Sequence, residues 1–413
     1  MKNLKIWNYI SFPWLIFTII FFVTFFLIAF LNEVDNSYLS KSYLNVLFFN
    51  TIFLSFGSAI LSALIAVPLA ILVTFYKFPG HKFFSWSLSL SIAFPAYVYA
   101  FIFVGIFEYA SPVSEYLRGF NIMLPSIKNI YGASLVMAMA LFPYIFLLTK
   151  AHLSSVGIKV FKAAKSLGDN NINAIRKVII PSLWPTITAG MALVIFETVA
   201  DFGGVSTLRV ETFTVGIYDA WFGYQSYFSA ARLAGYLLIF VFLIMLIMKY
   251  FGAKSNNLAS KTAEKFQKIE TSTFNKVIMS IICSIIFALV FCLPTSQLII
   301  WYFSDSALNI FTNLQLLLNS TFVGVFASCV TVFFAISLAL SFRQLNSLKP
   351  LIIISTSGYA IPGSVISAGL LIGFHFLFDT SITFYGIFGL IICLALSISF
   401  PFSGGGGGLL PSG

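Results

Sequence analysis

Charged residues are scarce in this sequence of 413 residues, where Asp, Glu, Lys and Arg together make up only 9%. Histidine occurs three times and cysteine four times, and neither type shows the spacing of a metal site or a disulfide framework. No Gly-Lys dipeptide occurs, so the chain has no Walker A phosphate-binding loop. A zinc-protease helix motif and a serine elbow are also absent, which makes an enzyme a weak interpretation.

Apolar residues are abundant instead, at 59% of the chain, and phenylalanine alone supplies 49 of them. A soluble domain cannot bury so much apolar surface. Several runs of 18 or more residues carry almost no charge, which is long enough for a helix to cross a hydrocarbon core of roughly 30 Å. These runs lack the polar–apolar alternation of barrel strands. The sequence therefore predicts an all-α polytopic membrane protein.

Ten membrane spans are expected. They cover residues 12–31, 44–76, 84–107, 130–149, 183–203, 232–250, 277–303, 315–342, 350–377 and 384–402. The run at 12–31 is too long for a signal-peptide core and is interpreted as a retained first span. All four cysteines (Cys283, Cys292, Cys329 and Cys393) fall within spans, and we expect them to be buried as small hydrophobic residues.

The distribution of positive charge predicts the orientation. With the N-terminus in the cytoplasm, 18 of the 23 Lys and Arg residues fall in cytoplasmic segments, as the positive-inside rule requires. The five outside are Lys41, Arg118, Lys128, Arg209 and Arg232. Because the net charge of +10 is located in loops between apolar spans, we attribute it to membrane orientation and expect no nucleic-acid partner.

The two halves of the chain resemble each other at an offset of 269 residues. Asn50–Phe53 reads Asn-Thr-Ile-Phe, and Asn319–Phe322 reads Asn-Ser-Thr-Phe. The span that follows each of these helices carries an internal proline, Pro95 in one half and Pro362 in the other. Such duplication is typical of transporters, whose pathway lies between repeats, although two Phe-, Leu- and Ala-rich helices can also resemble each other by chance.

The repeat predicts the domain organisation. A first repeat of six spans covers 1–251, a cytoplasmic linker 252–276, a second repeat of four spans 277–402, and a low-complexity tail 403–413. The second repeat ends where its matching cytoplasmic loop is expected to begin. We therefore expect either a truncated chain or a non-native tail, with a ten-span protein as the alternative.

The cytoplasmic loop at 150–182 carries the strongest local pattern. Val160–Leu167 favours a short helix, which Gly168 is expected to end in a left-handed conformation. Pro181 and Pro185 are expected to redirect the chain into the fifth span. The small residues Ala163 and Ala164 suit close docking on another protein. The alternative is a basic amphipathic helix bound to anionic lipid.

This loop resembles the signature cytoplasmic loop of ABC-importer permeases. The family pattern is Glu-Ala-Ala, three residues, Gly, nine residues, and an Ile-x-Leu-Pro ending. Ala163, Ala164, Gly168 and Pro181 match it, whereas Lys162 occupies the position of the Glu and puts one docking contact in doubt. The resemblance implies two tandem repeats of about six helices, a multi-pass protein of a bacterial inner membrane, and no bound cofactor. It also implies that ATP binds to separate cytoplasmic ATPase subunits.

The segments at 197–205, 212–222 and 358–363 are similar to iron(III) importer permeases. This similarity implies iron(III), delivered by an extracytoplasmic binding protein that docks near 33–41 and 209–227. Related permeases carry thiamine, polyamines, phosphonates or sulfate, so these solutes stay open. An ion-coupled secondary transporter is a further alternative, because it too has repeats and membrane carboxylates.

Glu197 and Asp201 lie one helical turn apart near the outer end of the fifth span. Carboxylates at membrane depth are costly and usually face a cavity or a partner. They are candidates for contact with a cation in transit. A structural role is favoured, however, either by pairing with Arg209 or Arg232 or by capping the turn at Gly203.

Overall fold

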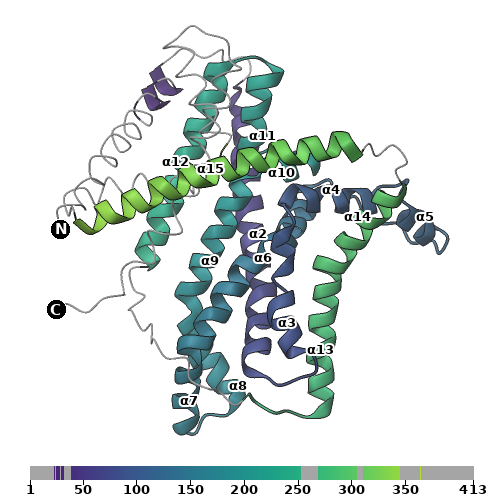
Figure 1. The fold of residues 1–413 in the computed structure, drawn as a ribbon, viewed down its shortest axis with the longest axis vertical. Coiled ribbons are helices and arrows are strands. Elements are labelled where there is room, and N and C mark those ends of the chain that lie inside the picture. Colours follow the sequence, from purple (N-terminus) through teal and green to yellow (C-terminus); the bar gives the residue numbers. More distant parts are fainter. Residues whose placement is uncertain are drawn as a thin grey trace. The chain divides into compact units, whose positions relative to one another are not determined.

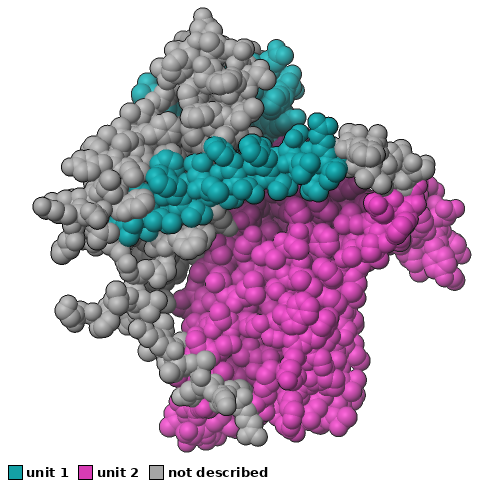
Figure 2. All heavy atoms as spheres, viewed as in Figure 1, with its two compact units in different colours: residues 1–47, 213–242, 305–413 teal, residues 48–212, 243–304 magenta. Residues whose placement is uncertain are grey.

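The computed structural model describes residues 39–252, 268–304 and 310–344, together with positions 23, 25–27, 29–31 and 363. The chain divides into two compact units (Figure 2). Unit 1 comprises residues 1–47, 213–242 and 305–413, and unit 2 comprises residues 48–212 and 243–304.

The described elements are helical apart from one isolated bridge between Tyr76 and Ile269. The helices of the first half are α2 (Lys41–Phe75), α3 (His81–Ser87), η2 (Leu90–Ala93), α4 (Ala96–Phe107), α5 (Pro112–Arg118), α6 (Ile130–His152), η3 (Leu153–Gly157), α7 (Ile158–Ser166), α8 (Asn171–Asn173), η4 (Ala174–Ile179), α9 (Ile180–Ala200), α10 (Gly203–Thr207), α11 (Phe213–Tyr218), η5 (Asp219–Gly223) and α12 (Tyr227–Gly252). They are followed by α13 (Thr273–Phe287), η6 (Ala288–Cys292), α14 (Leu293–Ser304) and α15 (Ile310–Gln344).

Seven helices of the described part are long and apolar enough to cross a membrane. They cover Lys41–Phe75, Ala96–Arg118, Ile130–Ser155, Asn171–Ala200, Tyr227–Ile247, Thr273–Ser304 and Leu314–Ser337. The all-helical membrane class is thereby confirmed. The expected spans at 350–377 and 384–402, and most of 12–31, lie outside the described residues, so the number of ten stays a prediction.

The expected continuous span at 84–107 is wrong, because the chain breaks at Pro95. Phe94 is extended, with φ −94° and ψ 124°, and Pro95 becomes the N-cap of α4. A proline disfavours the helical conformation of the residue before it, and here that preference prevails. The apolar run is therefore divided among α3, η2 and the 12-residue helix α4.

The expected turn at Pro181 is also wrong. The π-helical segment η4 leads directly into α9, since Ile179 and Ile180 keep helical dihedral angles. Proline is tolerated at the first position of a helix, and a π-turn supplies an irregularity next to its missing N–H group. The segments α8, η4 and α9 thus form one rod, and α6, η3 and α7 form a second beside it (Figure 1).

Small residues let the helices of unit 2 approach closely. A Cβ at Gly190 of α9 would lie 3.0 Å from the Ile145 side chain of α6. A Cβ at Gly57 of α2 would lie 3.2 Å from Ser134 Oγ of α6. The hydroxyl of Ser62 donates to the carbonyl of Ala138 at 3.3 Å. Such contacts hold membrane helices together where the hydrophobic effect between them is weak.

Unit 1 is built around α12. A Cβ at Gly235 of this helix would lie 2.9 Å from the ring of Phe30. Arg232, also on α12, donates from Nε to the carbonyl of Ala29 at 3.1 Å. Helix α11 packs nearby, where a Cβ at Gly216 would lie 2.9 Å from Leu47 and 3.5 Å from Leu233 of α12.

Helix α15 is described over Ile310–Gln344, and the residues on either side of it lie outside the described part of the chain. Among the described cysteines, the expectation of burial is confirmed for Cys283 and wrong for Cys292 and Cys329, which are exposed on their helices, whereas Cys393 lies outside the described residues. An exposed thiol on an apolar helix still faces a hydrocarbon environment, so burial within the protein is not required of it.

Candidate functional site: a helical hairpin tip and a carboxylate-lined cavity

The tip of the α6–α9 hairpin carries the signature loop. Gly168 has φ +95°, a left-handed conformation that favours glycine. Its N–H donates to the carbonyl of Lys165 at 3.1 Å, and the N–H of Asp169 donates to the carbonyl of Ala164 at 3.2 Å. These two bonds form a Schellman motif, which satisfies the last carbonyls of α7. The prediction that Gly168 ends this helix is confirmed.

The two faces of α7 have different environments. Phe161 and Ala164 are buried, and the ring of Phe161 lies 5.0 Å from that of Phe75 at the end of α2. Lys162 and Ala163 are exposed on the opposite side. The two alanines of the signature therefore differ: Ala164 packs α7 against its own unit, and Ala163 faces outward.

Apolar side chains also project from the tip. Leu167 is 88% exposed and Ile172 is 71% exposed. Pro181 lies on the exposed side of α9, further from the tip. Because these apolar groups are not packed against the described part of the chain, they are accessible to another protein surface.

A second feature, a cavity of about 300 Å³, lies at the far end of α9. Residues of η2 and the start of α4, of α6, and of the end of α9 line it, among them Pro95, Tyr97, Tyr144, Glu197 and Asp201. The Tyr144 hydroxyl donates to Glu197 Oε1 at 3.5 Å, a long and weak hydrogen bond. The structure thus places the predicted pair Glu197 and Asp201 on one wall of the cavity.

Asp201 also has a clear structural role. Helix α9 ends there, where the backbone becomes extended, and Asp201 Oδ1 accepts a hydrogen bond from the N–H of Gly204 at 2.8 Å. A Cβ at Gly204 would lie 2.8 Å from Asp201 Oδ2 and 3.4 Å from the carbonyl of Ala96. The Asp-Phe-Gly-Gly sequence therefore caps α10 and allows it to pack against α4. This contact corresponds to capping of the turn near Gly203, which is one of the two structural roles that the sequence left open.

Helix α9 connects the two features. About 20 residues separate Pro181 from Asp201, and a helix of that length spans about 30 Å, the thickness of a hydrocarbon core. The loop residues Lys162, Ala163, Ala164 and Gly168 lie near one end of this rod, and the carboxylates lie at the other. Sequence reasoning missed Tyr97 and Tyr144, whose only signal is their position near the prolines at 95 and 143.

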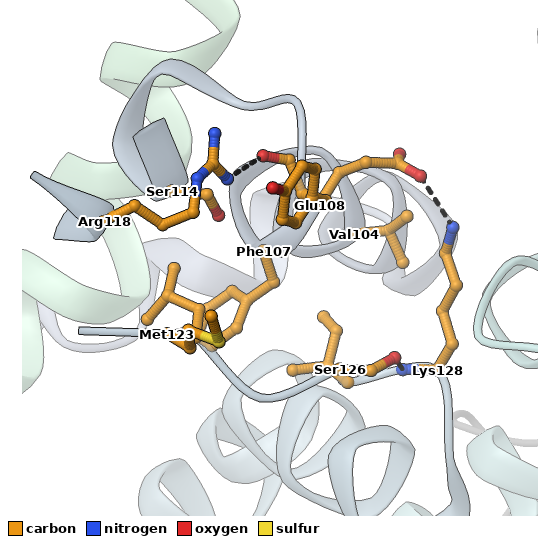
Figure 3. A pocket seen from close by; sticks show the side chains of 11 residues that line it. Val104, Phe107, Glu108, Ser114, Arg118, Met123, Ser126 and Lys128 are labelled. Atoms are coloured by element: carbon orange, nitrogen blue, oxygen red, sulfur yellow. Dashed lines mark hydrogen bonds and ion pairs between the residues drawn. The ribbon is translucent and has the colours of Figure 1, made fainter. Parts of the chain in front are cut away.

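A further hollow of about 310 Å³ lies where α4 leads into α5 (Figure 3). Its apolar wall includes Phe107 and Met123. Lys128 Nζ lies 3.1 Å from Glu108 Oε1 at its rim. Arg118 donates to the carbonyl of Tyr109 and stacks over that ring, with 4.0 Å between the guanidinium carbon and the ring centroid. No group of three or more His, Cys, Asp and Glu suited to a metal ion occurs among the described residues.

Residues 66–257 match the sequence family described as binding-protein-dependent transport system inner membrane component. This range contains the whole hairpin, its tip and the carboxylate-lined cavity. This part of the chain resembles the inner membrane permeases of that family. The match agrees with the expectation of a multi-pass transport component that is not itself an ATPase, in a family whose members carry no cofactor.

Curated relatives of this chain differ in the solute that they are named for. The sulfate transport system permease protein CysT of Salmonella typhimurium is 26% identical over 151 residues, which cover 37% of this chain and 54% of CysT. The Fe(3+)-transport system permease protein FbpB 2 of Haemophilus influenzae is 25% identical over 327 residues, or 77% of this chain and 61% of FbpB 2. The putative 2-aminoethylphosphonate transport system permease protein PhnU of Salmonella choleraesuis is 24% identical over 169 residues, covering 38% and 59%. This chain therefore spans between half and two thirds of the length of these relatives.

Proposed function

We propose that this chain is the membrane-spanning permease of an ATP-driven importer. The observation that carries the proposal is the continuous rod α8–η4–α9, which joins an exposed hairpin tip to a cavity lined by Glu197 and Asp201. Movement at the tip is transmitted along a packed helix to the cavity. The tip is the docking site for a separate ATPase subunit, and the cavity is part of the solute pathway.

The docking surface consists of the side chains that face outward at the tip, namely Lys162, Ala163, Leu167 and Ile172. The ordered Schellman turn at Gly168 presents them in one fixed arrangement, which reduces the entropy lost on binding. Closure of the ATPase pair displaces the tip, and the pathway opens to alternate sides. Ala164 and Pro181 act within the permease, by holding α7 and starting α9.

The orientation that we propose places the N-terminus and the hairpin tip in the cytoplasm. The concentration of Lys and Arg in the segments on that side supports it. The opposite side then carries the hollow bounded by Glu108, Arg118 and Lys128. We propose this hollow as a contact site for an extracytoplasmic binding protein, in addition to the segments 33–41 and 209–227 that the sequence predicts.

A tandem repeat is part of the proposal. The similarity of Asn50–Phe53 to Asn319–Phe322, 269 positions further along the sequence, supports a second repeat that begins like the first. A linker at 252–276 then joins the repeats. Most of that linker, and the second repeat beyond α15 except Gly363, lie outside the described residues.

Iron(III) is the solute that we propose. The similarity to FbpB 2 covers 77% of this chain, whereas the similarity to CysT covers 37%. Carboxylate oxygens at the cavity suit a hard cation in transit. Sulfate and a phosphonate are the competing solutes, since relatives named for them match the same family.

Co-purification with the ATPase encoded beside this chain tests the docking site. The native complex is expected to survive size-exclusion chromatography, and Leu167→Asp is expected to dissociate it because a carboxylate enters the apolar contact. Glu115→Gln on α5 is the control, since it alters charge at the outer end. If the Leu167→Asp chain formed the complex as well as the native chain, the tip would not be the docking site, and an ion-coupled carrier would be the favoured alternative.

A further inference from the structure

A group of lysines gathers where several helices of unit 2 reach the membrane boundary. The group, called here the lysine cluster, consists of Lys77, Lys82, Lys150, Lys268 and Lys276. Lys77 follows α2, Lys82 lies on α3 and Lys150 lies near the end of α6, while the other two flank the start of α13. Helices α3 and α13 lie side by side at this end of the unit (Figure 1).

Backbone pairing holds the cluster together. The N–H of Ile269 donates to the carbonyl of Phe75 at 2.8 Å, and the N–H of Lys77 donates to the carbonyl of Ile269 at 3.1 Å. Lys77 Nζ lies 2.7 Å from Glu270 Oε1, and Lys276 Nζ lies 3.7 Å from Glu270 Oε2. A single carboxylate thus lies between two of the lysines, and both ion pairs are at the surface.

The inner lysines are bonded to neutral oxygens. Lys268 Nζ donates to the carbonyl of Val73 at 2.7 Å, and Lys150 Nζ donates to the carbonyl of Ser85. Ser85 is three residues after Lys82 on α3, and the charges of both Lys150 and Lys82 act on Lys268. Burial lowers the pKa of Lys268, and the positive charges of Lys150 and Lys82 lower it further. The carbonyls orient these ammonium groups without neutralising them.

Exposed aromatic rings border the lysines. Phe83 is 42% exposed and Trp86 is 55% exposed, and both lie on α3. The ring of Phe83 is 5.2 Å from that of Phe287 on α13, which fixes its position between the two helices. Aromatic rings beside basic side chains are typical of the level where lipid headgroups meet acyl chains.

We propose that the lysine cluster binds the phosphate of an anionic phospholipid headgroup, with Phe83 and Trp86 against the upper part of its acyl chains. A phosphate would relieve the repulsion among these five ammonium groups, for which Glu270 is the one carboxylate that forms ion pairs in the described part of the chain. Basic pockets between membrane helices recognise anionic headgroups by this charge complementarity. The site connects α2, α3, α6 and α13, so a bound lipid would also hold these helices together. This inference does not rest on the transported solute or on the docking of an ATPase.

Native mass spectrometry of the delipidated full chain in detergent tests the site. Phosphatidylglycerol is titrated against phosphatidylcholine, with inorganic phosphate in a separate arm. The test variant is Lys82→Gln/Lys276→Gln, which keeps both lysines that cap backbone carbonyls. The control variant is Lys165→Gln/Lys177→Gln, which removes the same charge from the hairpin.

Phosphatidylglycerol is expected to bind the native chain and the control variant alike, and the test variant about 25-fold more weakly, from about fivefold per lysine. Equal melting temperatures of the two variants exclude loss of folding as the cause. Equal affinity of both variants for phosphatidylglycerol would overturn the proposal, as would equal binding of phosphatidylcholine. Binding of inorganic phosphate with no preference for the lipid would replace the lipid site by a site for free phosphate.

Discussion

Substitution of Gly168 is expected to change the backbone conformation of the hairpin tip while leaving the stability of the folded protein unchanged. A side chain at φ +95° is strained, and a left-handed conformation costs a non-glycine residue about 1–2 kcal/mol. A Cβ there would meet nothing within 4 Å, so the backbone conformation is the whole penalty. The two hydrogen bonds of the Schellman motif contribute about 1 kcal/mol each, so Gly168→Val removes most of what orders the tip.

A penalty of about 2 kcal/mol shifts a local equilibrium about 30-fold. Because the packing of α6 on α9 lies away from the tip, we expect the Gly168→Val chain to insert and fold normally. Solute uptake by proteoliposomes that contain the ATPase and binding protein is expected to fall about tenfold or more. Gly168→Asn is the matched control, since asparagine tolerates left-handed conformations better than other side chains. Normal uptake by the Val variant, or an equal loss with Asn, would refute the reasoning.

The remaining predictions concern packing and the cavity. Gly204→Ala is expected to destabilise the protein by about 1–3 kcal/mol, because the new methyl group meets Asp201 Oδ2 at 2.8 Å. Thermal unfolding measures this loss. Gly223→Ala is the control, because a Cβ at Gly223 meets nothing within 4 Å. Ala164→Leu is expected to lower the melting temperature, because the larger side chain overpacks a buried position. Ala163→Leu, on the exposed face, is expected to leave the melting temperature unchanged and to weaken binding of the ATPase. Glu197→Gln is expected to reduce cation uptake about tenfold, a loss of about 1.4 kcal/mol, with complex formation intact; unchanged uptake would remove this carboxylate from the pathway.

Local rules predicted the tip well. The left-handed conformation at the end of α7 could be predicted because Gly168 adopts it without strain. Ala163 and Ala164 could be placed on that helix because they lie only a few residues before the glycine. The membrane class was equally predictable, because it depends on summed hydropathy and not on any contact. The capping role of Asp201 depends on a glycine three residues later, which is again a local relation.

The sequence could not predict which prolines interrupt a helix. Pro68, Pro143 and Pro185 lie inside α2, α6 and α9, whereas Pro95 breaks its run. Whether a proline is tolerated depends on neighbouring groups that satisfy the freed carbonyls, and these come from other helices.

The cavity could not be predicted from the sequence either, because contacts between different helices form it. Tyr144 and Glu197 are brought together by the crossing of α6 on α9, and neither residue signals the other in the sequence. The exposure of Cys292 likewise depends on which side of its helix faces the rest of the protein.

ATP hydrolysis by the reconstituted complex tests the central claim most directly. The complex contains this chain, the ATPase encoded beside it and the extracytoplasmic binding protein, in lipid vesicles. We predict that the iron-loaded binding protein stimulates hydrolysis, that the iron-free protein does not, and that Gly168→Val abolishes the stimulation. Stimulation by the sulfate-loaded or phosphonate-loaded binding protein instead would keep the importer and replace its solute. Hydrolysis that is unaffected by every loaded binding protein and by Gly168→Val would contradict the account.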